Sequence, residues 1–247
     1  MPTQDSLAPP SSAPRGVLVI ACGALAREII ALRRASDWRD LEVRCLPPEL
    51  HNRPEQIPAA VQREIREHRA RYREVFVAYG DCGTGGRLDA LLRAEGIERL
   101  PGAHCYEAFA TAGVFAELSD AEPGTFFLTD FLVRHFERLV WRGLGLDRHP
   151  ELAGEYFRHY RRVVYLAQTA SEELGERARE IAASLGLAYE HRHTGYGDLA
   201  AALARFKARR ATDGEALAAR REEPSARSVE GSTVPGIEES GALAWAS

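Results

Sequence analysis

Four cysteines are the residues of this sequence best suited to chemistry. Cys22, Cys82 and Cys105 each follow a strand-like run, whereas Cys45 lies inside one and is interpreted as a packing residue. The chain has 247 residues and begins without a secretion signal, so a disulfide framework is not expected. Thiolates bind soft or borderline metals, such as Zn²⁺ or the iron of an Fe–S cluster. The pattern therefore favours a metal site over simple packing of the three thiols.

A histidine is the expected fourth ligand of such a site. His51 follows the second strand-like run, and His104 is adjacent to Cys105. Three cysteines and a histidine form a closed, structural zinc site, whereas an open fourth position is typical of a catalytic or cluster site. The predicted ligands are Cys22, Cys82, Cys105 and His51. The sequence leaves open whether the group is zinc or an Fe–S cluster, and whether His104 takes the place of His51.

The glycine-rich segment 80–86 surrounds one of these cysteines. Its glycines do not have the GxGxxG spacing, and no Walker lysine follows, so a dinucleotide is not expected. We instead expect Gly83, Thr84, Gly85 and Gly86 to contact a cofactor, because their backbone N–H groups could bond to the sulfur atoms of a cysteine-bound centre.

The elements that must position these residues alternate between strand-like and helix-like runs. Alternation of this kind predicts an α/β fold with a mostly parallel, Rossmann-like layered sheet and helices on both faces. Ligand sites in such sheets lie at the carboxyl ends of the strands, where the three cysteines are expected to meet. Strands are predicted at 16–21, 41–46, 74–79, just before Cys105, 162–167 and 187–191; helices at 24–34, 57–72, 86–94, 128–144, 150–160, 171–185 and 198–209.

The two ends of the chain differ in composition from the part between them. Residues 1–15 are rich in proline and serine and are predicted to be a disordered tail. Residues 16–209 are predicted to form the α/β domain, and residues 210–247 a disordered or partly helical tail.

Composition excludes several classes of partner. The formal net charge is −4, so no global basic field would attract nucleic acid or an anionic membrane surface. No apolar run approaches the roughly 18 residues needed to span a bilayer. We therefore expect a cytoplasmic protein that binds a small-molecule substrate, without nucleic acid or membrane as partners.

Six segments together resemble the family catalogued as domain of unknown function 1638 (DUF1638). The segments that carry this resemblance are 21–28, 46–54, 79–86, 104–107, 124–132 and 196–199. The resemblance implies cysteines at the positions of Cys22, Cys82 and Cys105. It also implies an association with corrinoid proteins and corrinoid-dependent methyltransferases, and so a role in one-carbon metabolism.

The functional expectation is a metal-binding α/β protein that acts close to corrinoid-dependent methyl transfer. The alternative is a non-enzymatic accessory module that docks on a corrinoid protein or methyltransferase. Thiol redox chemistry between two of the cysteines is a third hypothesis, disfavoured because the sequence contains no CxxC motif. The sequence does not decide whether the protein is an enzyme.

Overall fold

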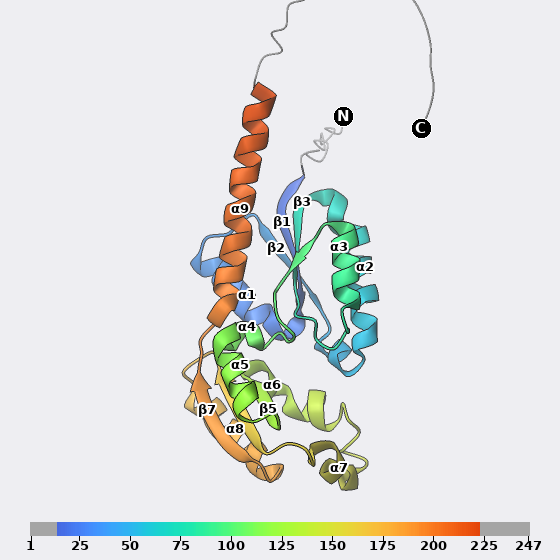
Figure 1. The fold of residues 1–247 in the computed structure, drawn as a ribbon, viewed down its shortest axis with the longest axis vertical. Helices are drawn as coiled ribbons and strands as arrows, with labels where there is room; N and C mark the ends of the chain where they lie inside the picture. The colour runs from blue at the N-terminus through green and yellow to red at the C-terminus, as the bar shows by residue number, and fades with distance from the viewer. Residues whose placement is uncertain (1–13, 223–247) are drawn as a thin grey trace, which may run out of the picture. The chain divides into compact units, whose positions relative to one another are not determined.

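The computed structural model describes residues 14–222 and contains two parallel β-sheets (Figure 1). The first sheet has the strand order β2-β1-β3-β4 and the second has the order β5-β6-β7. The strands are β1 (Arg15–Cys22), β2 (Leu41–Leu46), β3 (Tyr72–Ala78), β4 (Glu98–Arg99), β5 (Thr125–Thr129), β6 (Arg162–Ala167) and β7 (Ala188–His193). The predicted α/β fold with parallel strands is confirmed; the division of the strands between two sheets was not predicted.

Helices connect the parallel strands, as crossover connections require. They are α1 (Ala26–Ala35), α2 (Ile57–His68), α3 (Arg87–Glu95), α4 (Glu107–Ala110), α5 (Ala112–Ala121), α6 (Asp130–Phe136), α7 (Ala153–Phe157), α8 (Glu172–Ser184) and α9 (Gly197–Glu222). Figure 1 shows α2 and α3 on one side of the first sheet and α1 on the other. Shorter helical turns lie at Gly23–Leu25, Pro48–Asn52, Pro54–Gln56, Arg69–Arg71, Glu137–Trp141 and Pro150–Leu152.

The first core is built around the central strands β1 and β3. Residues 18–21 of β1 are completely buried, because helices cover both faces of the sheet. Ile29 of α1 and Val61 of α2 belong to this core, and Phe206 of α9 packs on Phe76 of β3 with ring centroids 4.8 Å apart. This packing holds the carboxyl ends of β1 and β3 in fixed positions.

The second core surrounds β5 and β6. Val133 of α6 and Ile181 of α8 pack with Val163 and Tyr165 of β6, while Leu118 of α5 packs with the alternate residue Val164. Successive residues of a strand point to opposite faces, so the two sets of helices cover opposite faces of the second sheet.

Two predicted helices include residues that belong to strands in the structure. The helix predicted at 57–72 ends at His68, and Tyr72 is the first residue of β3, where its side chain is buried. The helix predicted from residue 128 begins instead at Asp130, after the strand β5. The run 125–129 pairs in register with residues 162–166 of β6. A short apolar run does not distinguish a strand from a buried helix by periodicity, so only this pairing decides.

The predicted disordered tails fall mostly outside the described residues. Strand β1 begins at Arg15, one residue before the predicted start of the domain, and α9 continues past Arg209 to Glu222. Within residues 14–222, no helix is both long enough and apolar enough to span a lipid bilayer.

Candidate metal centre

The three predicted cysteines lie at the carboxyl ends of strands of the first sheet. Cys22 is the last residue of β1, Cys82 follows β3, and Cys105 lies in the segment between β4 and α4. The chain leaves β1 toward β2 and leaves β3 toward β4, so the sheet order reverses between these two neighbours. Such a topological switch point opens a crevice, which is where parallel α/β sheets bind ligands.

Backbone hydrogen bonds bring Cys82 beside Cys105. The N–H of Asp81 donates to the carbonyl of Gly102 at 3.1 Å, and the N–H of Cys82 donates to the carbonyl of Ala103 at 2.7 Å. Gly80 allows this close approach, because a Cβ atom there would lie 2.8 Å from the carbonyl carbon of His104. The Sγ atoms of Cys82 and Cys105 are 3.1 Å apart and are not joined in a disulfide.

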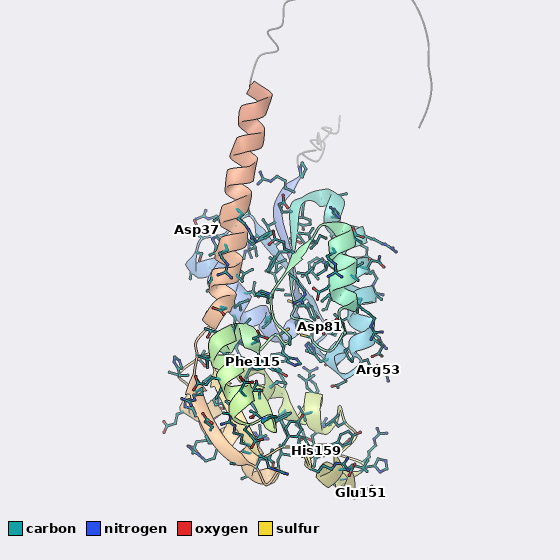
Figure 2. All side chains as sticks on the ribbon, viewed as in Figure 1. Asp37, Arg53, Asp81, Phe115, Glu151 and His159 are labelled. Carbon is teal, nitrogen blue, oxygen red and sulfur yellow. The ribbon has the colours of Figure 1, made fainter. Side chains whose placement is uncertain are left out.

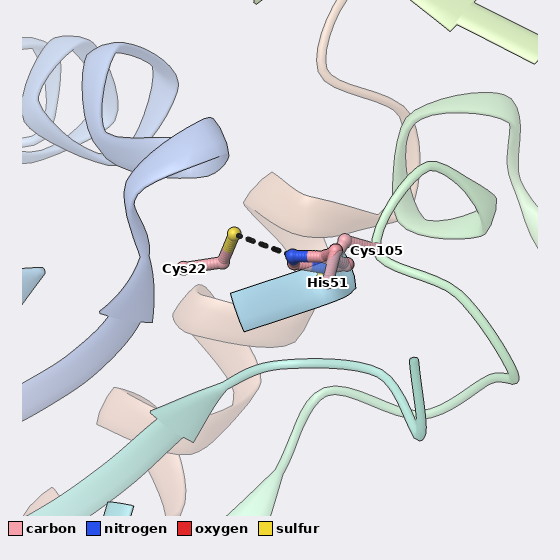
Figure 3. A group of neighbouring side chains, drawn as sticks. All are labelled: Cys22, His51 and Cys105. Atoms are coloured by element: carbon pink, nitrogen blue, oxygen red, sulfur yellow. Dashed lines mark hydrogen bonds between the residues drawn. The ribbon is translucent and has the colours of Figure 1, made fainter. Parts of the chain in front are cut away.

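His51 reaches the same place from the helical turn Pro48–Asn52 that follows β2. Its Nδ1 lies 3.0 Å from the carbonyl of Pro48 and 3.9 Å from Sγ of Cys22. Contacts between an imidazole and a backbone carbonyl commonly orient metal-binding histidines. The ligand atoms of Cys22, His51 and Cys105 all lie within 4.8 Å of one another. Figure 3 shows the three side chains meeting between the ends of the strands.

The thiols and the imidazole change one another's protonation. Burial by itself lowers the pKa of His51, but contact with the Cys105 and Cys82 thiols outweighs it and raises that pKa to about 10. Contact with Cys105, together with burial, raises the pKa of Cys82, and contact with Cys22 raises that of Cys105. The cluster therefore holds protons tightly, and a metal ion would have to displace them.

The comparison with known protein families identifies one family for this chain. A family model described as a protein of unknown function, DUF1638, matches residues 45–203. The chain belongs to the DUF1638 family. The resemblance seen in the sequence is therefore confirmed. The matched region contains His51, Cys82 and Cys105, while Cys22 precedes it. No curated protein matches the chain.

Two further residues of this DUF1638 chain lie apart from the cluster. Cys45 is exposed on β2, so it does not fill the core as the sequence suggested, and it stays outside the group of ligand atoms. His104 is also outside that group; its ring stacks on Tyr106 with centroids 4.9 Å apart. Of the two predicted histidines, the structure places His51 among the thiols.

Asp81 organises the glycine-rich loop of the DUF1638 chain. Its carboxylate accepts hydrogen bonds from the Thr84 hydroxyl at 2.6 Å and from the N–H groups of Gly85 and Gly86 at 3.1 and 2.9 Å. These donors fold the loop onto its own carboxylate, near the strand ends of the first sheet (Figure 2), and are not directed at sulfur. Of the four residues predicted to contact a cofactor, only Gly83 lines the cavity that opens beside the cysteines, which is described below.

Tyr79 is a residue of the site that the sequence did not single out as functional. Its side chain is completely buried, and its ring lies nearly parallel to that of His51, with centroids 6.1 Å apart. Its hydroxyl has no hydrogen-bond partner among the described residues. Burial and the nearby Cys22, Cys105 and Cys82 thiols raise the pKa of Tyr79, which keeps the hydroxyl protonated. The one signal in the sequence was its position at the end of a strand.

An apolar cavity of about 390 Å³ opens beside the cluster. His51, Cys82 and Cys105 form part of its wall. Most of the remaining wall consists of apolar or aromatic side chains, among them Phe109 and Phe131. No Asp, Glu, Lys or Arg side chain of the described residues lines it. The cavity therefore suits a small, uncharged, largely apolar ligand and disfavours a nucleotide or another phosphorylated compound.

Proposed function

We propose that this DUF1638 member is a metal-binding protein that presents one zinc-class ion to a small substrate. The observation that carries the proposal is the convergence of Cys22, His51 and Cys105, whose ligand atoms lie within 4.8 Å of one another. Cys82 is not part of that group, but its Sγ lies 3.1 Å from that of Cys105 at the cavity wall, from where it would supply a fourth donor. Thiolate and imidazole together form a donor set typical of Zn²⁺.

The donor spacing favours a single ion over an Fe–S cluster. A Zn–S bond of about 2.3 Å in a tetrahedral site places two sulfur ligands about 3.8 Å apart. The sulfur atoms of Cys82 and Cys105 are 3.1 Å apart, and the ligand atoms of Cys22, His51 and Cys105 are at most 4.8 Å apart. The sulfur–sulfur distance of a tetrahedral zinc site lies between these two values. A cluster attaches its cysteines to different iron atoms and so needs sulfur atoms farther apart.

The position of the cavity supports a chemical role for the ion. Zinc lowers the pKa of a coordinated thiol or water and makes it a nucleophile near neutral pH. The apolar wall excludes water and would hold the rest of a small thiol or similar substrate beside the ligands. Cys22, His51 and Cys105 would be the permanent ligands, and Cys82 the donor that a substrate replaces.

A link to corrinoid-dependent methyl transfer is a second part of the proposal and is supported by the family resemblance alone. A corrinoid is far larger than the 390 Å³ cavity, so a corrinoid protein or methyltransferase would have to dock at its mouth. Growth on methylated substrates tests this part. The test variant has Cys22, Cys82 and Cys105 all changed to Ser. Normal growth with this variant, if it folds, would favour the hypothesis of an accessory docking module over that of a metal-dependent role.

The decisive experiment is metal analysis of the full chain purified without oxygen, combined with an absorption spectrum. We expect about one zinc per chain and no visible absorption band. Cys22→Ser, Cys105→Ser and His51→Ala should each lose most of the metal, whereas the matched control Cys45→Ser should retain it. Folded wild-type protein without metal contradicts the proposal, and several irons per chain with a visible band contradict a single zinc.

A further inference from the structure

A second cavity, of about 330 Å³, lies away from the metal ligands. It is bounded by α1, the first turns of α6, the segment after β6 and the segment before α9. Three of the segments that carry the family resemblance contribute to it. Segment 21–28 supplies Arg27 and Glu28, segment 124–132 supplies Asp130, and segment 196–199 supplies Tyr196. None of these residues belongs to the cluster of cysteines and His51.

Glu28 contributes to this cavity a carboxylate with an unpaired oxygen atom. Only 6% of the surface of Glu28 is exposed to solvent, and its Oε2 atom is buried without a hydrogen bond. The neighbouring Asp130 is different, because its carboxylate accepts from the Tyr165 hydroxyl at 2.6 Å, the Gln168 N–H at 3.0 Å and the Thr169 hydroxyl at 2.5 Å. Buried carboxylate oxygens are almost always hydrogen-bonded, so the Glu28 carboxylate keeps acceptor capacity that no described residue uses.

Arginines supply the opposite charge around the same cavity. Arg27 and Arg34 are seven residues apart on α1 and therefore lie on one face of that helix. Neither makes an ion pair at hydrogen-bond distance within the described residues, although Arg27 lies close enough to act on the charge of Glu28. Arg134 also lines the cavity, and its guanidinium donates to the backbone carbonyl of Asp130 at 3.1 Å.

We propose that this cavity binds a small molecule of the α-amino-acid class. Its carboxylate would be held by Arg27 and Arg34, and its ammonium group would donate to the carboxylate of Glu28. Three guanidinium groups and two carboxylates leave one net positive charge around the cavity, which fits a zwitterion or a monoanion. The volume is at the small end of ligand sites, which excludes a nucleotide. Burial raises the pKa of Glu28, and a bound ammonium would offset that cost.

Calorimetric titration of the full chain tests the proposal, with L-alanine, acetate, ethylammonium and inorganic phosphate as separate probes. We expect L-alanine to bind one to one, and at least about tenfold more tightly than acetate or ethylammonium, because only L-alanine carries both groups. Glu28→Gln and Arg27→Gln should each weaken it about tenfold or more, the usual effect of losing a charged hydrogen bond. The control Arg39→Gln, an exposed residue paired with Asp37, should leave binding unchanged.

Three results would overturn the proposal. They are the absence of saturable binding of L-alanine, equal binding of L-alanine by wild type and Glu28→Gln, and preferential binding of phosphate that does not depend on Glu28. Metal content separates this inference from the proposed function. Glu28→Gln should keep its metal, and Cys22→Ser should keep its affinity for L-alanine.

Discussion

At the scale of single residues, the hydroxyl of Tyr79 is the group most directly tied to the cysteine cluster. It is buried beside the thiols and has no oxygen or nitrogen partner among the described residues. A thiolate of the cluster is the acceptor that its surroundings offer, and hydrogen bonds to sulfur tune a metal site.

We predict that Tyr79→Phe folds normally but binds metal about tenfold more weakly, the lower end of the effect expected for groups that support metal ligands. Competition with a chromogenic chelator measures the affinity. Cobalt substitution provides a second measurement, in which the sulfur-to-cobalt charge-transfer band should shift. Tyr156→Phe, at an exposed position, is the matched control. An unchanged affinity together with an unchanged band would show that Tyr79 only fills space.

Glu28 predicts a dependence of stability on pH. Its folded-state pKa is raised above the unfolded value of 4.5, first because burial disfavours the charged form. A raised carboxyl pKa costs nothing below the unfolded pKa; the cost grows as pH rises from there through the folded-state pKa and is constant above it. At pH 8, the free energy of unfolding of Glu28→Gln should therefore exceed that of wild type by about 1–3 kcal/mol. Its unfolding temperature should be higher as well. The difference should shrink toward pH 4 in thermal melts. A difference that is constant from pH 4 to 8 contradicts this explanation.

At the scale of elements, the pairing of the two loops after β3 and β4 determines whether the thiols meet. Gly80 lies where these loops touch, and an added Cβ atom would come within 2.8 Å of the His104 backbone. Backbone atoms cannot move aside as a flexible side chain can, so the Cys105 segment would have to shift.

We predict that Gly80→Ala loses most of its bound metal and that its free energy of unfolding falls by about 1–3 kcal/mol, as for other overpacked sites. Metal analysis and urea unfolding measure the two effects. Gly175→Ala in α8 is the control, because a Cβ atom there meets no other atom within 4 Å. Normal metal content in Gly80→Ala would show that the loop pairing does not control the site.

The elements also show where sequence patterns suffice. The predicted strands 41–46 and 162–167 have the observed bounds. The apolar, β-branched run in 162–167 is typical of a buried strand, and the alternation of apolar and charged residues in 41–46 is typical of a half-buried one. Only the last two residues of β5 were predicted, as the beginning of a helix, and α4 and α5 were not predicted. Thr129 does cap the following helix, with its hydroxyl accepting from the N–H of Leu132. The cap is a local interaction within four residues, whereas the strand before it depends on pairing with β6.

At the scale of the whole molecule, the ligands join parts of the chain that are far apart in sequence. Cys22 is the last residue of β1, and His51 and Cys105 come from the connections after β2 and β4. A metal ion that binds all three exists only on the folded chain, so it stabilises the fold by mass action.

We predict that removing the metal with a chelator lowers the unfolding temperature by about 5–10 °C. Metal present at a hundred times its dissociation constant contributes about 2.7 kcal/mol, and each kcal/mol corresponds to about 2–4 °C for a domain of this size. Differential scanning calorimetry measures the change. Cys45→Ser should show the same decrease, and Cys22→Ser should show almost none. An equal decrease in all three proteins would point to an effect of the chelator unrelated to the cluster.

The sequence by itself determined the fold class, the family and the placement of three thiols at strand ends. These follow from local properties, namely the apolar runs that make buried strands and the rule that parallel strands end at one edge. Only the tertiary structure decided that His51 and not His104 joins the thiols, that Tyr79 lies among them, and that the strands divide into two sheets. It also brought Glu28 beside Asp130. The reason is that contacts such as the Cys82 N–H to Ala103 carbonyl bond join distant segments, and such contacts leave no periodic pattern in the sequence.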